Sequence, residues 1–480
     1  MSPVADDGRI STEVLVVGSG AGGAPTAALL AEAGFDVTVL EEGAMVRQGE
    51  VVPFSLDQMD RQYRAGGVTA ALGRPAIAYT EGCCAGGGTE INSGLYRRPP
   101  EEVLERWRRV HRVADLASAD VETICDEVER ELSVQTVPGA QTPASEALRR
   151  GAAALGWRHD EIPRWMTYPD GTAATAGRRQ SMTETYLPRA ERAGARLLTG
   201  HRVDRLVLER GRAVRAEVTA GDRPVTVEFD HVVVCGGAIQ SPALLQRSGL
   251  RRNVGRTLAV HPTVKVAARF TDAVNVPDDV PVHQVKEFAP DLSFGGSASN
   301  PGLVALALSD SWSRFGPAIT EWRHVSVYYA AITSEGRGWV QAVPGLRDPV
   351  VTYRLTRKDR AVLARGLARL ALLLLEAGAV EVYPSYRDAP VVRARRDLAA
   401  VQGTYATTRA SVMTVHLCST VPIGETPAAA ADSHGLVHGT ANVRVHDASL
   451  LPDAPGVNPQ ASVMAMAIRN TRHLIATVAR

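Results

Sequence analysis

The sequence has almost no excess of charge of either sign, with 53 Lys and Arg residues against 52 Asp and Glu residues and a formal net charge of +1. A chain without a field of one sign has no long-range attraction for nucleic acid or for a charged membrane surface, so we expect neither as a partner. Lysine is especially scarce and occurs only at Lys265, Lys286 and Lys358. Because the arginines are dispersed among acidic residues, we interpret this scarcity as codon usage and not as the mark of a phosphate-binding surface.

Cysteine and long apolar runs are also scarce. The chain has 5 cysteines, too few for a disulfide scaffold, and no C-x-x-C pair that would indicate zinc. Cys83 and Cys84 are adjacent, but no neighbouring motif supports a redox pair. The apolar stretch 367–379 is interrupted by Arg369 and is too short to span a bilayer, and no secretory signal is visible at the start. We therefore expect a soluble, cytoplasmic protein.

The length of 480 residues and the hydrophobic content of 45% predict two or three domains or one large interleaved enzyme. Segment 101–190 has helical, charged patterns, whereas 263–410 contains many strand-like stretches and one long helix. Before it, a buried strand at 232–234 leads into two glycines and a helix, for which Ser241 would be the N-cap and Pro242 a first-turn residue. Segment 263–410 therefore resembles a separate sheet-based domain.

A strand–turn–helix–strand pattern lies near the start of the chain. Apolar strands are predicted at 14–17 and 36–40, and Glu41 follows the second. The turn between them carries Gly18, Gly20 and Gly23 in G-x-G-x-x-G spacing. Such glycines allow a tight turn, close approach of the backbone to a pyrophosphate and close helix–strand packing, while the acid suits ribose hydroxyls. This pattern predicts a dinucleotide site, NAD or FAD, with a tight turn in an unrelated sheet as the alternative.

A second glycine cluster, 86–88, lies within "EGCCAGGGTEINSGLYRRPP". The run is too small for a helix or strand, so it would let the backbone lie against a flat ligand or a diphosphate. A flexible surface loop is the alternative.

The stretch "GVNPQASVMAMAIRN" raises the question of why a polar amide precedes an apolar helix. A residue before proline is pushed into an extended conformation, asparagine is a favoured N-cap, and proline suits the first helical position. Asn458 would therefore cap a helix that begins at Pro459. The positive end of that helix would then point at a partner elsewhere in the chain's fold.

Four patches of sequence are together specific for one family. They are the unit ending at Glu41, "GGGTEINSGLY", "GAIQSPALLQRSGL", and the region from "TVHLCSTVPIGE" to "DASLLPDAPGVNPQASVMAMAIR". On these motifs the chain resembles the glucose–methanol–choline (GMC) flavoprotein oxidoreductases over nearly its whole length. One departure concerns a turn: the family usually continues with glycine where Arg251 follows Leu250.

The resemblance implies an α/β fold in which a Rossmann-like FAD-binding domain is interleaved with a sheet-based (α+β) substrate domain. The FAD-binding domain would comprise 11–100, 191–262 and 411–480, the substrate domain 263–410, and 101–190 would be a helical connection and part of the substrate domain. The implied activity is oxidation of an alcohol CH–OH group to an aldehyde or ketone, by hydride transfer to flavin N5 while a base takes the hydroxyl proton. The implied partners are a small-molecule alcohol and an electron acceptor, either oxygen or a redox carrier.

The resemblance also implies the site residues. The catalytic histidine falls on His416 of "TVHLCS" and its partner on Asn458 of "GVNPQ", where the helix would point its positive end at the flavin N1 edge. Contacts with FAD would come from Gly18, Gly20, Gly23, Glu41, Gly87, Asn92, Gly94, Val203, Asp447, Ala448, Pro459 and Gln460. Some relatives attach flavin through a histidine directly before the asparagine of the glycine patch. Here that residue is Ile91, which offers no nucleophile, so we expect non-covalent FAD.

Several histidines have simpler interpretations. By spacing alone His416 would be a core histidine, and His261, before Pro262, would shape a turn. Three more, His434, His438 and His446, are close in sequence, but glycines interrupt them and no carboxylate completes a zinc motif, so we expect no metal. The alternative functions are a flavin-containing lyase of the same family and an NAD-dependent dehydrogenase.

Overall fold

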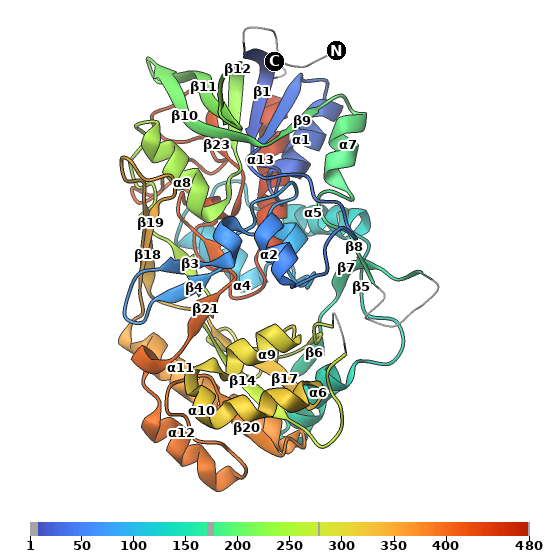
Figure 1. Cartoon of the computed structure of the whole chain (residues 1–480). Helices are drawn as coiled ribbons and strands as arrows, with labels where there is room; N and C mark the ends of the chain where they lie inside the picture. The colour runs from blue at the N-terminus through green and yellow to red at the C-terminus, as the bar shows by residue number, and fades with distance from the viewer. Residues whose placement is uncertain (1–7, 170–176, 277–278, 479–480) are drawn as a thin grey trace.

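The computed structural model describes residues 8–169, 177–276 and 279–478. Two large sheets dominate it, one at the top and one toward the bottom of the view in Figure 1. The parts of the predicted segments 101–190, 263–410 and 411–480 that fall at 170–176, 277–278 and 479–480 lie outside the described residues.

The first sheet contains the predicted strand–turn–helix–strand unit. Its order is β10-β11-β12-β1-β2-β9, with β23 beside β12. The strands are β1 (Arg9–Val17), β2 (Val37–Glu41), β9 (Arg196–Thr199), β10 (His201–Glu209), β11 (Arg212–Ala220), β12 (Arg223–Val234) and β23 (Val443–Val445). β1 pairs in parallel with β2 and β12, and α1 (Gly23–Glu32) connects β1 to β2. Every residue of β2 is buried, as expected for a parallel strand covered on both faces. The Rossmann-like prediction is confirmed.

The second sheet has the order β3-β4-β21-β14-β17-β16-β15-β6, with β20 beside β14. Its strands are β3 (Thr69–Ala71), β4 (Ile77–Tyr79), β6 (His159–Glu161), β14 (Thr263–Arg269), β15 (His283–Val285), β16 (Leu292–Gly296), β17 (Val325–Ile332), β20 (Glu381–Pro384) and β21 (Val412–Thr414). The long helix α11 (Arg357–Glu376) packs against β14 and β17. β3, β4 and β21 lie in segments predicted for the FAD-binding domain, yet they extend this sheet. Three-residue strands are too short to show a period in the sequence.

Two predicted helix starts need correction. α8 (Gly237–Arg247) begins before Ser241, whose hydroxyl donates to the Asp447 carboxylate instead of capping the helix. Pro242 lies within the helix. α13 (Gln460–Val478) begins one residue later than predicted, and the Pro459 carbonyl accepts from Val463 N at 2.9 Å. The Asn458 side chain is therefore free for another role.

The other helices are α2 (Leu56–Gln62), α3 (Gly88–Ile91), α4 (Glu101–Arg109), α5 (Ser118–Glu131), α6 (Pro143–Ala154), α7 (Tyr186–Arg192), α9 (Pro301–Leu308), α10 (Trp312–Phe315) and α12 (Leu398–Thr404). α3 is a single turn that starts inside the second glycine cluster, where no helix was expected. Short strands outside the two large sheets are β5 (Val134–Gln135), β7 (Arg164–Thr167), β8 (Arg178–Arg179), β13 (Ala259–Val260), β18 (Arg337–Gln341), β19 (Val350–Arg354) and β22 (Leu417–Cys418). Within the described ranges, no helix has the length and apolar composition needed to cross a bilayer.

Candidate active site

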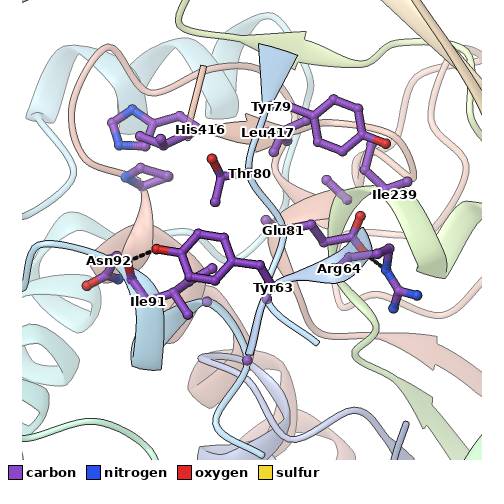
Figure 2. Close-up of a pocket in the computed structure, with 18 of the residues that line it drawn as sticks. Tyr63, Arg64, Tyr79, Thr80, Glu81, Ile91, Asn92, Ile239, His416 and Leu417 are labelled. Carbon is purple, nitrogen blue, oxygen red and sulfur yellow. Dashed lines mark hydrogen bonds and ion pairs between the residues drawn. The ribbon is translucent and has the colours of Figure 1, made fainter. Parts of the chain in front are cut away.

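A cavity of about 1120 Å³ has walls from both sheets. One wall contains the carboxyl ends of β1 and β2, the edge at which open α/β sheets bind ligands, and the other contains residues of β14, β16 and β17. The residues predicted to contact FAD all line this cavity except Gly23, and so do His416 and Asn458. In Figure 2, His416 and Asn92 lie on one side of the view and the Arg64–Glu81 ion pair on the other.

The glycines of the first turn have two different structural roles. Gly18 has a φ of +102°, and a Cβ there would lie 2.4 Å from the Cys235 carbonyl oxygen. A Cβ on Gly23 would lie 1.9 Å from the Gly18 carbonyl oxygen, so this glycine allows the helix to pack closely on its strand. A Cβ on Gly20 would meet no protein atom closer than 3.9 Å and would enter the cavity. Gly20 therefore leaves space for a ligand, whereas Gly18 and Gly23 leave space for the protein's own backbone.

Ser19 connects the acid and the two glycine segments. Oε2 of Glu41 accepts from Ser19 N at 3.1 Å and from Ser19 Oγ at 2.7 Å, while Oε1 accepts from Gly43 N at 2.9 Å. Gly86 N donates to Ser19 Oγ at 3.0 Å. Burial raises the pKa of Glu41, and these hydrogen bonds act in the opposite direction. A carboxylate has roughly four acceptor sites, so Glu41 retains capacity for a ligand hydroxyl.

Backbone from both glycine segments leaves open space along the cavity wall. Gly20 and Gly87 form part of its wall with backbone alone, and a Cβ on Gly87 would lie 3.2 Å from Gly20 Cα. Side chains at these positions would fill the space that a pyrophosphate requires. Pockets for drug-sized ligands have volumes of roughly 300–1,000 Å³, and the volume of this cavity, about 1120 Å³, lies above that range.

His416 forms a hydrogen bond with His261, whose sequence context had suggested only a turn. The two Nδ1 atoms are 2.9 Å apart, and Gly456 N donates to His261 Nε2 at 3.1 Å. Since a backbone N–H can only donate, the neutral His261 ring carries its proton on Nδ1. That N–H donates a hydrogen bond to His416 Nδ1. Neutral His416 then carries its own proton on Nε2. Burial, reinforced by the charge of Lys286, lowers the pKa of His416 to about 4, and burial also holds the pKa of His261 well below its usual range.

Asn458 belongs to a second hydrogen-bonded group. Its Oδ1 accepts from Gln284 Nε2 at 3.4 Å, and the same nitrogen donates to Tyr329 OH at 3.2 Å. Directly after the Asn458–Pro459 pair, Gln460 Oε1 accepts from Asn92 Nδ2 at 2.8 Å. Gln284 of the second sheet therefore orients Asn458. Asn92, which follows the second glycine cluster, is hydrogen-bonded to the first residue of α13.

The cavity-lining residues that the sequence did not identify include His261, Lys265, Gln284, Lys286 and Tyr329. Alternation in "TVKVAAR" could have placed Thr263 and Lys265 on one face of a strand. No comparable signal distinguishes His261, because a residue before proline suggests only an extended conformation.

The histidines and cysteines without a proposed role have the following surroundings in the structure. Among residues 8–169, 177–276 and 279–478 no cluster of potential metal ligands occurs, and His446 interacts with Thr26 and Thr471. Cys83 and Cys84 are free thiols, and burial raises the pKa of both.

Family models match most of the chain. Two models described as GMC oxidoreductase match residues 59–263 and 338–467, and an NAD(P)-binding Rossmann-like domain matches 16–46. An uncharacterized GMC-type oxidoreductase of Sinorhizobium fredii is 36% identical over 488 residues, covering 96% of this chain and 94% of that protein.

More distant relatives include a long-chain-alcohol oxidase of Arabidopsis thaliana. It is 26% identical over 520 residues, covering 96% of this chain and 67% of its own length. The solved structure of pyridoxine 4-oxidase from Mesorbium loti has a TM-score of 0.74 at 19% identity, covering 96% of this chain and 99% of that one, and shows the similarity of fold.

Proposed function

Since the chain belongs to the GMC oxidoreductase family and is an oxidoreductase acting on alcohol-type donors, we propose that it oxidises the CH–OH group of a small-molecule alcohol to an aldehyde or ketone with FAD. The observation that supports this most is that His416 and Asn458 line the same cavity as Gly20 and Gly87. The final electron acceptor would be oxygen or a redox carrier.

We propose that FAD is held without a covalent bond. Gly20 and Gly87 would face its pyrophosphate, Glu41 its ribose, and Asn92 and Gln460 its flavin end. When bound, FAD supplies the acceptor for the hydride. Ile91, at the attachment position of some relatives, is a hydrocarbon side chain and offers no nucleophile.

His416 is our candidate for the base that takes the hydroxyl proton. Its Nδ1 faces His261, so Nε2 is the nitrogen that remains to meet the alcohol. To accept there, neutral His416 must carry its proton on Nδ1, which moves the His261 proton to Nε2 and breaks the bond from Gly456. The change leaves two buried donors without an acceptor, Gly456 N–H and His261 Nε2–H, each at a cost of about 1–3 kcal/mol. General-base help of about 10²–10⁴-fold corresponds to roughly 3–5 kcal/mol, which is of the same size as this cost.

Asn458 would orient the alcohol. Because Gln284 donates to its Oδ1, the Asn458 amide Nδ2 is directed to donate elsewhere, and the cavity lies beside it. A donor at the alcohol oxygen holds the CH–OH group in position and stabilises the negative charge that develops as the proton leaves.

The test begins with the purified protein. It should be yellow as isolated, and an anaerobic panel of alcohols should bleach that colour, with air then restoring it if oxygen is the acceptor. A colourless protein that uses NAD, or a yellow protein that no alcohol bleaches while it cleaves a hydroxynitrile, would contradict the proposal.

A further inference from the structure

Two of the three lysines of this chain line the same cavity. Lys265 and Lys286 line the cavity, while Lys358 is exposed and forms an ion pair with Glu335 at 2.6 Å. In a chain whose basic residues are otherwise arginine, two lysines in one cavity are poorly explained by codon usage alone. Arginine presents a wide planar fork, whereas lysine places a compact ammonium group at a point.

Lys265 belongs to one row of residues across the second sheet. Strand pairing aligns Lys265 with Tyr329, Tyr329 with Gly295, and Gly295 with Gln284. Residues directly opposite in paired strands share a face of the sheet. A Cβ on Gly295 would lie 2.4 Å from the Tyr329 hydroxyl, so the tyrosine ring reaches over this glycine toward Gln284. The row therefore connects Lys265 to the hydrogen bond that orients Asn458.

Lys286 lies on the same side and lines the cavity together with the histidine pair. It follows Gln284 by two residues, the spacing that returns a strand to the same face. It is 9% exposed, and its charge lowers the pKa of both His416 and His261. An ammonium group therefore lines the same cavity as the proposed site of proton transfer.

Neither lysine has an ion-pair partner among the residues that the structure describes. Asp160, whose charge raises the pKa of Lys286, is already paired with Arg97 at 3.0 Å, and only burial perturbs the pKa of Lys265. The carboxylates of the cavity wall have other partners: Glu41 and Asp447 accept from nearby backbone N–H groups, and Glu42 and Glu81 pair with Arg64. A buried charge without a counter-charge is unfavourable, so this surface lacks an anion.

We infer that the alcohol substrate carries an anionic group, a carboxylate, phosphate or sulfate, which is bound by Lys265 on β14 and by Lys286 directly after β15. This inference rests on the proposed function and deepens it by naming the substrate class. Since Lys286 and His416 line the same cavity, the anionic group and the CH–OH group would belong to one small alcohol. Burial lowers the pKa of each lysine to about 8, which leaves both mostly protonated at neutral pH.

The test uses FAD-bound protein and compares binding of benzoate with that of benzamide by calorimetry. The two probes have the same shape and differ in charge, and neither has a CH–OH group, so no turnover interferes. Acetate, inorganic phosphate and inorganic sulfate then distinguish a carboxylate site from a phosphate or sulfate site. The variants are Lys265→Met, Lys286→Met, their combination, and the matched control Lys358→Met.

We expect benzoate or one of the inorganic anions to bind at least about tenfold more tightly than benzamide. The preference should fall to within about threefold in the double methionine variant, survive in Lys358→Met, and be partly kept in Lys265→Arg, which retains the charge. Methionine removes a buried charge while keeping the side-chain length, so the fold should be retained, as melting curves would verify.

Binding of every tested anion no tighter than that of benzamide, or a preference that survives in the double variant, would overturn the inference. So would the failure of every anion to bind with a Kd of about 10 mM or tighter. The proposed function fails separately, because flavin bleaching by an uncharged alcohol needs no anion binding, and anion binding needs no flavin reduction.

Discussion

Replacing Gly20 by alanine should separate cofactor binding from folding. The new methyl group would meet no protein atom closer than 3.9 Å, and Gly20 does not adopt the left-handed backbone conformation that disfavours alanine. It would, however, enter the space that we assign to the pyrophosphate. Overpacking costs about 1–3 kcal/mol, so the Kd for FAD should rise roughly 5- to 150-fold while the apoprotein unfolds at an unchanged urea concentration.

The matched control is Gly23→Ala, whose methyl group would lie 1.9 Å from the Gly18 carbonyl oxygen. That variant should lose stability in the apoprotein as well as flavin. The assay combines flavin fluorescence titration with urea unfolding of the same samples. If Gly20→Ala binds FAD as tightly as the wild type, the pyrophosphate does not lie against Gly20. If instead the apoprotein itself is destabilised as strongly as in Gly23→Ala, the division of the glycines into two roles is wrong.

Four further predictions concern the reacting end of the cavity. Asn458→Ala should keep FAD but slow its reduction about 10²–10³-fold, and Asn458→Asp should be slower still because a carboxylate opposes negative charge at the flavin N1 edge; a faster Asp variant in stopped-flow reduction would refute this role. Because burial lowers the pKa of His416 to about 4, the residue stays neutral on acidification through its usual value of about 6.5, so the reduction rate should not fall near pH 6.5. Between about pH 6.5 and pH 4, His416 is protonated in the unfolded chain but neutral in the folded protein. Its contribution to stability is therefore lost as the pH falls through that range, which urea unfolding would measure. Acid precipitation should leave flavin in the supernatant, because Ile91 offers no attachment; flavin on the washed precipitate would contradict this.

Much of the fold could be predicted because its signals are local. Buried parallel strands, the spacing of Gly18, Gly20 and Gly23, and the acid after β2 all lie within a short stretch of sequence. The starts of α8 and α13 were misplaced because Ser241 and Asn458 are typical N-cap residues, but their side chains have partners far along the chain in Asp447 and Gln284. Tertiary contacts therefore outweighed local propensity at both positions.

The site was predictable only where a motif carried it. His416 and Asn458 came from the family resemblance, and both line the cavity. His261 could not be found, because its importance arises from Nδ1 of a histidine 155 residues away along the chain. Lys265 and Lys286 were visible as rare residues, but strand pairing was needed to bring the first of them into register with Tyr329.

The central claim is tested most directly by anaerobic stopped-flow reduction of the flavin in His416→Ala. The control is His283→Ala, since His283 is also buried in the second sheet but hydrogen-bonds to Ser145 Oγ at 3.0 Å and does not line the cavity. We predict that both variants bind FAD, that His283→Ala is reduced within about threefold of the wild-type rate, and that His416→Ala is slower by about 10²–10⁴-fold. Reduction of His416→Ala within about threefold of the wild type would contradict the assignment of His416 as the base.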